Sequence, residues 1–140
     1  NFKYKVTKAA TITAGKTAKG KVEVVGLSAA GKKKTSVSVG TSVNYTTNGE
    51  KAAYTISSLG AGAFKGASKL KAVTLSKNIK SIKKDTFKNC KNLSKLALKA
   101  KLSSVAKNSF KGCKKTIKVS GTSAKANVKK LVKSGYKKFK

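Results

Sequence analysis

Few side chains in this sequence could do chemistry. The chain has two cysteines, Cys90 and Cys113, a single acid in its second half, Asp85, and no histidine. Histidine is the commonest general base and metal ligand, so its absence removes the usual partner of a nucleophile. A catalytic carboxylate normally needs a second one, and the abundant serines could pair only with lysine. We therefore expect no catalytic, metal or cofactor site, and we assign Asp85 to capping a helical turn.

Lysine dominates the sequence instead. The 140 residues include 34 lysines, no arginine and three acids (Glu23, Glu50, Asp85), which gives a formal charge of +31. A charge of this size spreads a positive potential over most of the surface, so we expect anionic partners. Arginine supplies the planar fork that reads guanine and phosphate, so lysine alone favours diffuse attraction over specific nucleic-acid recognition.

A motif recurs in the second half of the chain. Its phenylalanines, Phe64, Phe87 and Phe110, are spaced by 23 residues. A period of this size predicts a solenoid, in which each repeat buries its apolar side only by stacking on its neighbours. Other apolar columns keep the same register: Leu70 with Leu93, Val73 with Leu96 and Val119, Leu75 with Leu98, Ile79 with Leu102, and Ile82 with Val105.

Each repeat combines a strand pattern with a turn pattern. "LKAVTL" and "LSKLAL" end in alternating apolar residues, which predicts one short parallel strand per repeat. Asp85 and Asn108 precede their phenylalanines by two residues, where a polar side chain can cap a single helical turn. Gly62 occupies that position in the first copy.

Lysines follow the repeat in columns. Lys65, Lys88 and Lys111 come directly after each phenylalanine, and Lys95 and Lys118 share an outward strand position. Stacked charges about 5 Å apart repel by roughly 1 kcal/mol even in water, and a bound polyanion would relieve that repulsion. Alternatively, the side chains splay into salt and bind nothing specific. These five lysines are the predicted anion- or partner-binding residues.

The two cysteines lie one repeat apart, so they should occupy adjacent turns of the solenoid. A separation of about 5 Å permits a disulfide by distance, but parallel side chains do not match its dihedral requirements. We favour two buried, unpaired thiols over a disulfide.

The two ends of the chain have different patterns from the repeats. Residues 1–59 have strand-like alternation and a hairpin signal at Asn48-Gly49, which predict an antiparallel β cap. Residues 122–140 predict a C-terminal capping helix and a basic tail. Thr122 or Ser123 could cap the helix, which has Ala124, Val128, Leu131 and Val132 on one face and Gly135 at its end. The predicted fold is an α/β repeat, with residues 60–121 as the repeats between the two caps in one continuous domain.

The three copies together resemble the BspA-type leucine-rich repeat. "GAFKGASKLKAVTLSKNIKSI", "DTFKNCKNLSKLALKAKLSSV" and "NSFKGC" carry its pattern of Ala-Phe, Cys, and a Leu, Val, Ile strand over roughly residues 56–121. The matching positions are Ala63, Phe64, Leu70, Val73, Leu75, Ile82, Phe87, Cys90, Leu93, Leu96, Leu98, Val105, Phe110 and Cys113. Departures are Thr86 and Ser109 for Ala, Ala67 for Cys, and Lys83 and Ala106 for Gly.

The resemblance implies a secreted or surface-attached protein, and the lysine-rich ends are similar to those of members from Gram-positive gut bacteria. It implies adhesion or binding and carries over no catalytic residues. We expect a noncatalytic extracellular module that attracts an anionic cell-surface polymer or a protein partner. A structural stalk of a larger secreted enzyme and a nonspecific nucleic-acid-binding protein are the alternatives.

The chain also has features that bear on its processing. It begins with Asn1 and has no signal-peptide pattern, so we expect a processed product or a piece of a longer protein. No apolar run approaches the length of a membrane span, so we expect no membrane insertion.

Overall fold

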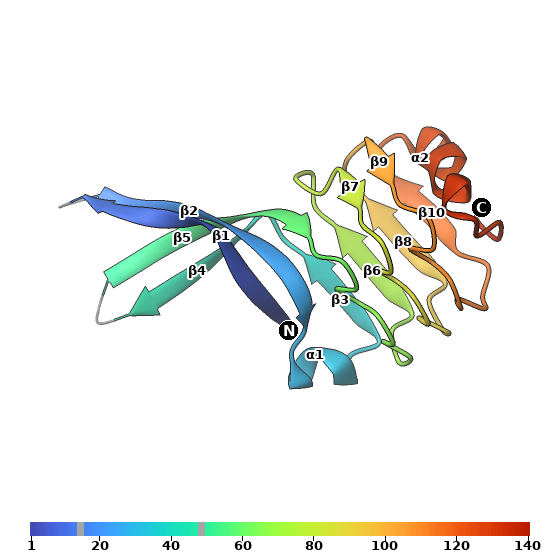
Figure 1. The fold of residues 1–140 in the computed structure, drawn as a ribbon, viewed down its shortest axis with the longest axis horizontal. Coiled ribbons are helices and arrows are strands. Elements are labelled where there is room, and N and C mark those ends of the chain that lie inside the picture. The colour runs from blue at the N-terminus through green and yellow to red at the C-terminus, as the bar shows by residue number, and fades with distance from the viewer. Residues whose placement is uncertain (14–15, 48–49) are drawn as a thin grey trace.

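The repeats form a parallel sheet, and a second sheet extends from one end of it. The computed structural model describes residues 1–13, 16–47 and 50–140. Figure 1 shows the two sheets side by side along the longest axis, with the helix at the C-terminal end farthest from the second sheet. The predicted Asn48-Gly49 turn lies outside the described residues.

The repeat sheet has four parallel strands in the order β10-β8-β6-β3. They are β3 (Ser36–Val39), β6 (Ala72–Leu75), β8 (Lys95–Leu98) and β10 (Lys118–Gly121). Val73 pairs with Leu96, and Leu96 pairs with Val119, so the predicted strand column is confirmed. All three side chains are buried, which shows that the column forms part of the core.

A third sheet, which has two parallel strands, forms another side of the repeats. It pairs β7 (Ser81–Ile82) with β9 (Ser104–Val105). Ile82 and Val105 are opposite each other in its register, as the 23-residue spacing predicts. The repeats that contain β6 and β8 are therefore coils with a strand on two of their sides.

The turns that precede the strands are not helical. The structure has no helix between residues 60 and 121, and Gly62, Asp85 and Asn108 have φ angles of 68°, 59° and 62°. The Asp85 carbonyl accepts the Lys88 amide at 3.0 Å, while the Asp85 carboxylate contacts the Lys88 ammonium. The predicted capping role is therefore wrong for Asp85. Glycine, aspartate and asparagine share this position because they tolerate left-handed backbone.

The phenylalanines stack along the solenoid. The ring centroids of Phe64 and Phe87 are 5.1 Å apart, and those of Phe87 and Phe110 are 5.0 Å apart, with interplanar angles of 4° and 16°. All three side chains are 0–1% exposed. Phe2 meets one end of this stack and Phe139 the other, both edge to face.

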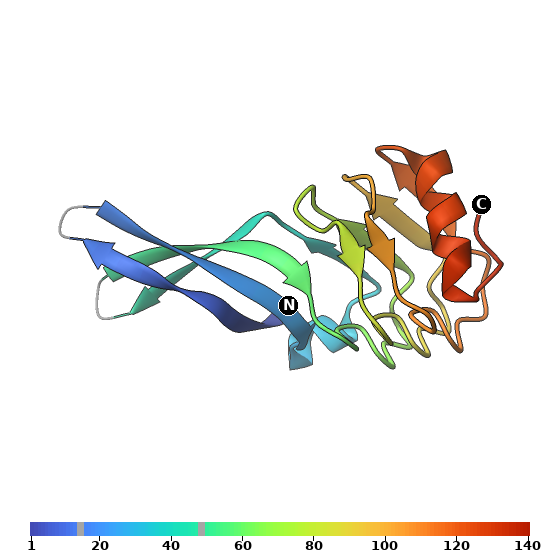
Figure 2. The same ribbon diagram turned by 45° about the horizontal axis from the view of Figure 1, so that its top comes forward.

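The second sheet, which we call the blade, has the order β1-β2-β5-β4. Its strands are β1 (Phe2–Thr13), β2 (Lys16–Leu27), β4 (Ser42–Thr47) and β5 (Glu50–Leu59). Figure 2 shows the blade extending away from the repeats. Among the described side chains of the blade, the buried ones in the core are Val22, Val24, Leu27, Ile56 and Leu59, and Phe2, Val43 and Tyr54 pack against it.

The expectation of antiparallel strands over residues 1–59 is only partly met. β1 pairs with β2, and β4 with β5, in antiparallel fashion, but β2 pairs with β5 in parallel. β3 leaves the blade and joins the repeat sheet beside β6. The predicted boundary at residue 59 therefore cuts across the repeat sheet, because a strand before it already occupies a repeat position.

Helices occupy little of the chain. α1 (Ala29–Lys33) begins after Ser28, whose hydroxyl accepts the Gly31 amide at 3.1 Å. α2 (Ala124–Leu131) leads into a 3-10 turn, η1 (Val132–Ser134), which ends at Gly135 with φ of 92°. Ser123 precedes α2 in a left-handed conformation and makes no side-chain cap, contrary to expectation. None of the described helices has the length and apolar character that crossing a membrane requires.

Candidate functional site

Three of the five predicted lysines, Lys65, Lys88 and Lys111, lie on the stacked turns, and we call them the turn column. The backbone holds them in rank, since the Gly66 amide donates to the Lys88 carbonyl and the Asn89 amide to the Lys111 carbonyl, both at 2.8 Å. Lys65 and Lys111 are exposed, whereas Lys88 is half-buried. The Lys88 Nζ lies 3.3 Å from the Asp85 carboxylate, so one member of this column is already neutralised in part.

The other two predicted lysines lie on a different side of the coil. Lys118 of β10 is directly opposite Lys95 of β8, and both are exposed. Ala72 occupies the equivalent position of β6, so this column has two members. The structure therefore brings Lys95 and Lys118 together on adjacent strands, about 4.8 Å apart at the backbone, but on another side of the coil from the turn column.

Few acids balance these charges. The ion pairs found among the described residues are Lys83–Glu23 and Lys88–Asp85. Burial alone would raise the pKa of Glu23, but hydrogen bonds from Lys83 and Ser58 and the charge of Lys83 outweigh it and lower the pKa. Most of the described lysines therefore have no acidic partner.

The cysteines are free and buried. The Cys90 thiol donates to the Phe64 carbonyl at 3.0 Å, and the Cys113 thiol to the Phe87 carbonyl at 3.2 Å. Burial raises the pKa of Cys90 to about 12 and that of Cys113 to about 11. Thiols with such pKa values are weak nucleophiles near neutral pH. The role of both cysteines is structural, because their hydrogen bonds link neighbouring repeats.

An open groove of about 900 Å³ lies where the strands of the repeat sheet end. Its walls come from the blade, from the loops after β6 and β8, and from α2. It is lined by Lys21, Thr55, Ser57, Lys77, Asn78, Lys80, Lys99, Ala100, Lys101, Leu102, Ser103 and Lys130. None of the five predicted lysines is among them. The sequence signal for this groove was the lysine content directly after each strand, in "SKNIK" and "KAKLS".

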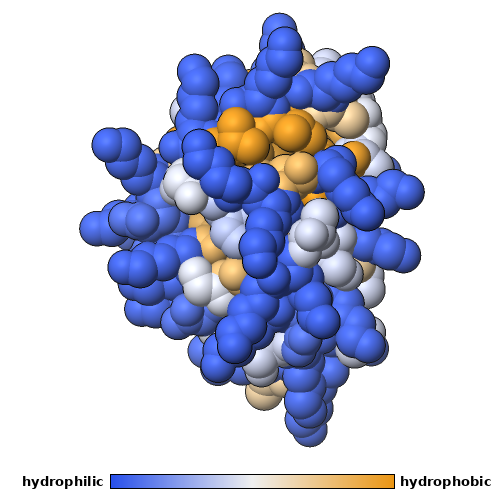
Figure 3. Space-filling view, turned by 90° about the vertical axis from the view of Figure 1, so that its right-hand side faces the viewer, coloured by the Kyte–Doolittle hydropathy of each residue, from blue (hydrophilic) through white to orange (hydrophobic). Residues whose placement is uncertain are grey.

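Hydrophilic side chains also surround the end of the solenoid. Figure 3 views the molecule from the end that carries α2 and the C-terminus, and shows hydrophilic side chains around a small apolar area.

No group of three or more His, Cys, Asp or Glu side chains lies together in the described part of the chain.

Comparison with known proteins agrees with this repeat architecture. The model of the BspA type Leucine rich repeat region (6 copies) matches residues 42–135. The chain belongs to this family. The matched residues begin before the predicted first repeat and include α2, so the BspA-type repeat region is longer than the sequence pattern indicated.

A solved structure has a similar fold. A crystal structure of a leucine-rich repeat protein from Bacteroides ovatus superimposes with a TM-score of 0.50 at 22% identity. The match covers 85% of this chain and 36% of that one, so this chain spans about a third of its length. No curated protein matches the chain.

Proposed function

We propose that this BspA-type repeat module is a noncatalytic extracellular binding module that attracts anionic polymers, or a protein partner, at a cell surface. The observation that carries the proposal is the formal charge of +31, with lysines of the stacked repeats held in rank and two ion pairs among the described residues. Family membership supports the coarser statement of a binding or structural role without catalysis.

The location and organisation are parts of the same proposal. A secreted or surface-attached state is supported by the resemblance of the repeats, and the module needs no cofactor or membrane insertion for binding. We retain residues 60–121 as the central repeats, with caps on either side, and add β3 to the N-terminal end of the repeat sheet.

Replacing Lys65, Lys88 and Lys111 by Gln tests whether the turn column attracts polyanions. We expect weaker heparin binding and a shallower dependence of log K on log salt, because fewer counterions are displaced. Unfolding should be little changed, since Lys65 and Lys111 are exposed and a partly exposed pair such as Lys88–Asp85 contributes about 1 kcal/mol or less. Unchanged binding with an unchanged salt slope would remove this column from the proposal.

A structural stalk is the second candidate, and the shape of the blade favours it. The blade extends from the repeats and exposes Tyr4, Val6, Val25 and Tyr45, as a connector between domains could (Figure 2). Its charge would then provide general adhesion. Nonspecific nucleic-acid binding is expected at low salt for any protein of this charge and would be lost as salt rises.

A further inference from the structure

We propose that the groove lined by Lys21, Lys80 and Lys101 binds a flexible phosphate polymer with hydroxylated spacers and no bases, of the poly(glycerol phosphate) kind. This inference rests on the proposed function and deepens it by assigning a site and a ligand class. The groove differs from the turn and strand columns, because it is concave and because several elements converge on it.

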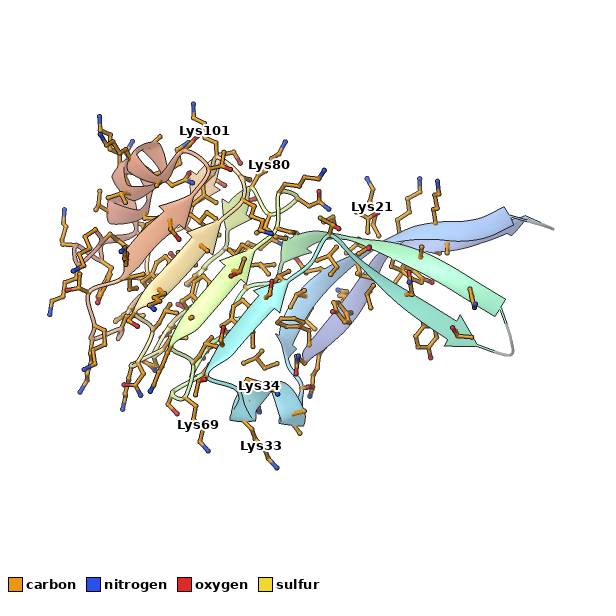
Figure 4. The ribbon with its side chains drawn as sticks, turned by 180° about the vertical axis from the view of Figure 1, so that it is seen from behind. Lys21, Lys33, Lys34, Lys69, Lys80 and Lys101 are labelled. Atoms are coloured by element: carbon orange, nitrogen blue, oxygen red, sulfur yellow. The ribbon has the colours of Figure 1, made fainter. Side chains whose placement is uncertain are left out.

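The charge of the groove is concentrated and unopposed. Six of its twelve lining residues are lysines and none is acidic. Glu23 and Asp85 are engaged with Lys83 and Lys88, which do not line the groove. Figure 4 shows Lys21, Lys80 and Lys101 along one edge of the molecule, with Lys80 and Lys101 over the repeats and Lys21 over the blade. A chain laid along this edge would meet ammonium groups from the blade and from two successive repeats.

The walls of the groove are fixed before any ligand arrives. The Ser103 amide donates to the Lys80 carbonyl at 2.7 Å, which locks the two repeat loops together. The Lys130 Nζ donates to the Ser103 carbonyl at 2.9 Å, so this ammonium is held at the α2 end. The loop after β8 is anchored through Leu102, which is 1% exposed. A preformed groove costs less ordering on binding than a flexible surface.

The types of lining residue narrow the ligand. Lysine binds phosphate as a point charge, whereas bidentate recognition of guanine or of a fixed phosphate geometry uses arginine. No aromatic side chain lines the groove, so bases would have no stacking platform. The side chains of Ser57, Asn78 and Ser103 already donate to backbone carbonyls, so their oxygens remain as acceptors for the hydroxyl groups of a spacer. Thr55 adds a further hydroxyl group.

Two triple variants with matched charge test the assignment. The groove variant is K21Q/K80Q/K101Q, and the control is K33Q/K34Q/K69Q, whose lysines lie on the opposite edge in Figure 4. All six lysines are exposed, and each variant loses three of them, so each lowers the formal charge from +31 to +28. A general electrostatic attraction would weaken equally in both variants.

Binding of labelled poly(glycerol phosphate) is measured by fluorescence anisotropy over a range of salt concentrations. We expect the groove variant to bind roughly tenfold or more weakly than the control at about 0.15 M salt, with a slope of log K against log salt that is shallower by roughly 2. K21R/K80R/K101R should retain binding. Circular dichroism establishes that all variants keep the fold.

The outcomes separate the two proposals. Equal losses in the groove and control variants would overturn the groove assignment while leaving polyanion binding intact. Tighter wild-type binding of single-stranded DNA than of poly(glycerol phosphate) would overturn the ligand class, and equal affinity for inorganic polyphosphate would show that the spacers contribute nothing. Wild-type protein that binds none of these polymers at about 0.15 M salt would contradict the polyanion binding in the proposed function and, with it, the groove assignment.

Discussion

Asn127 of α2 closes the last repeat loop with its side-chain amide. It is 1% exposed, and its Oδ1 accepts the Leu102 amide at 2.8 Å. Its Nδ2 donates to the carbonyls of Ala100 at 3.0 Å and Thr122 at 2.9 Å. Between the inner repeats, backbone groups of one loop bond to the next loop, as Ser103 does with Lys80. Asn127 supplies the corresponding partners where α2 covers the solenoid.

The substitution Asn127→Ala removes all three hydrogen bonds. A buried polar group without a partner costs about 1–3 kcal/mol, and the Leu102 amide belongs to a fully buried residue. The carbonyls have two lone pairs each and lose less, so we expect a total loss of about 3 kcal/mol in the free energy of unfolding. Unfolding entropy of about 2.1 cal/mol/K per residue over this chain turns that loss into a fall in Tm of about 10 °C.

Urea unfolding followed by far-ultraviolet circular dichroism measures the loss. Asn92→Ala is the matched control, because Asn92 is exposed and its side chain makes one bond, to the Ser68 carbonyl at 2.7 Å. It should cost about 0.5 kcal/mol or less. Amide hydrogen exchange at Leu102 should accelerate in Asn127→Ala. Equal losses in the two variants, with unchanged exchange at Leu102, would refute the closing role of Asn127.

Three further predictions concern the core and the titrating groups. Phe87→Ala should cost about 3–5 kcal/mol in urea unfolding, because it opens a gap in the middle of the phenylalanine stack. Cys90 and Cys113 should react with a thiol reagent at pH 8 only through opening of the fold, at rates far below those in denaturant, since their pKa values are about 12 and 11. Glu23→Gln should cost up to about 1 kcal/mol at pH 7, since its Lys83 partner is exposed, and progressively less as pH falls below the unfolded pKa of 4.5, because the stability from a lowered pKa is lost on acidification.

Each of these predictions has a contradicting result. A loss of under 1 kcal/mol in Phe87→Ala would mean that the rings do not form the centre of the core. Thiols that react as fast in the native protein as in urea would show that they are accessible. A Glu23→Gln variant as stable as wild type at pH 7 would show that the Lys83 pair contributes nothing.

The repeat strands were predictable because their apolar columns recur at a fixed spacing. Val73, Leu96 and Val119 pair as that spacing required. The position of β3 beside them could not be predicted, because its four residues lack a phenylalanine and do not belong to a complete 23-residue repeat. Its place depends on pairing with β6, a contact between segments far apart in the sequence.

Residue patterns did not predict the backbone conformation of the turns or the residues that line the groove. The pattern at Asp85 and Asn108 predicted helix capping. In the structure both residues have a left-handed backbone, as Gly62 does, and this conformation favours glycine, asparagine and aspartate. Columns of lysine were visible because members recur every 23 residues. The groove has both Lys21 of the blade and Lys101 of the repeats in its lining, a combination that only the fold determines.

The claim that the lysine arrays form a binding surface is tested most directly by titrating the wild-type protein with teichoic acid, heparin and duplex DNA at low salt and at about 0.15 M salt. The proposal predicts saturable binding of one polymer, teichoic acid, that survives at about 0.15 M salt, where exposed charges are screened beyond about 8 Å. Equal binding of all three polymers that disappears together as salt rises would contradict it and favour the structural stalk.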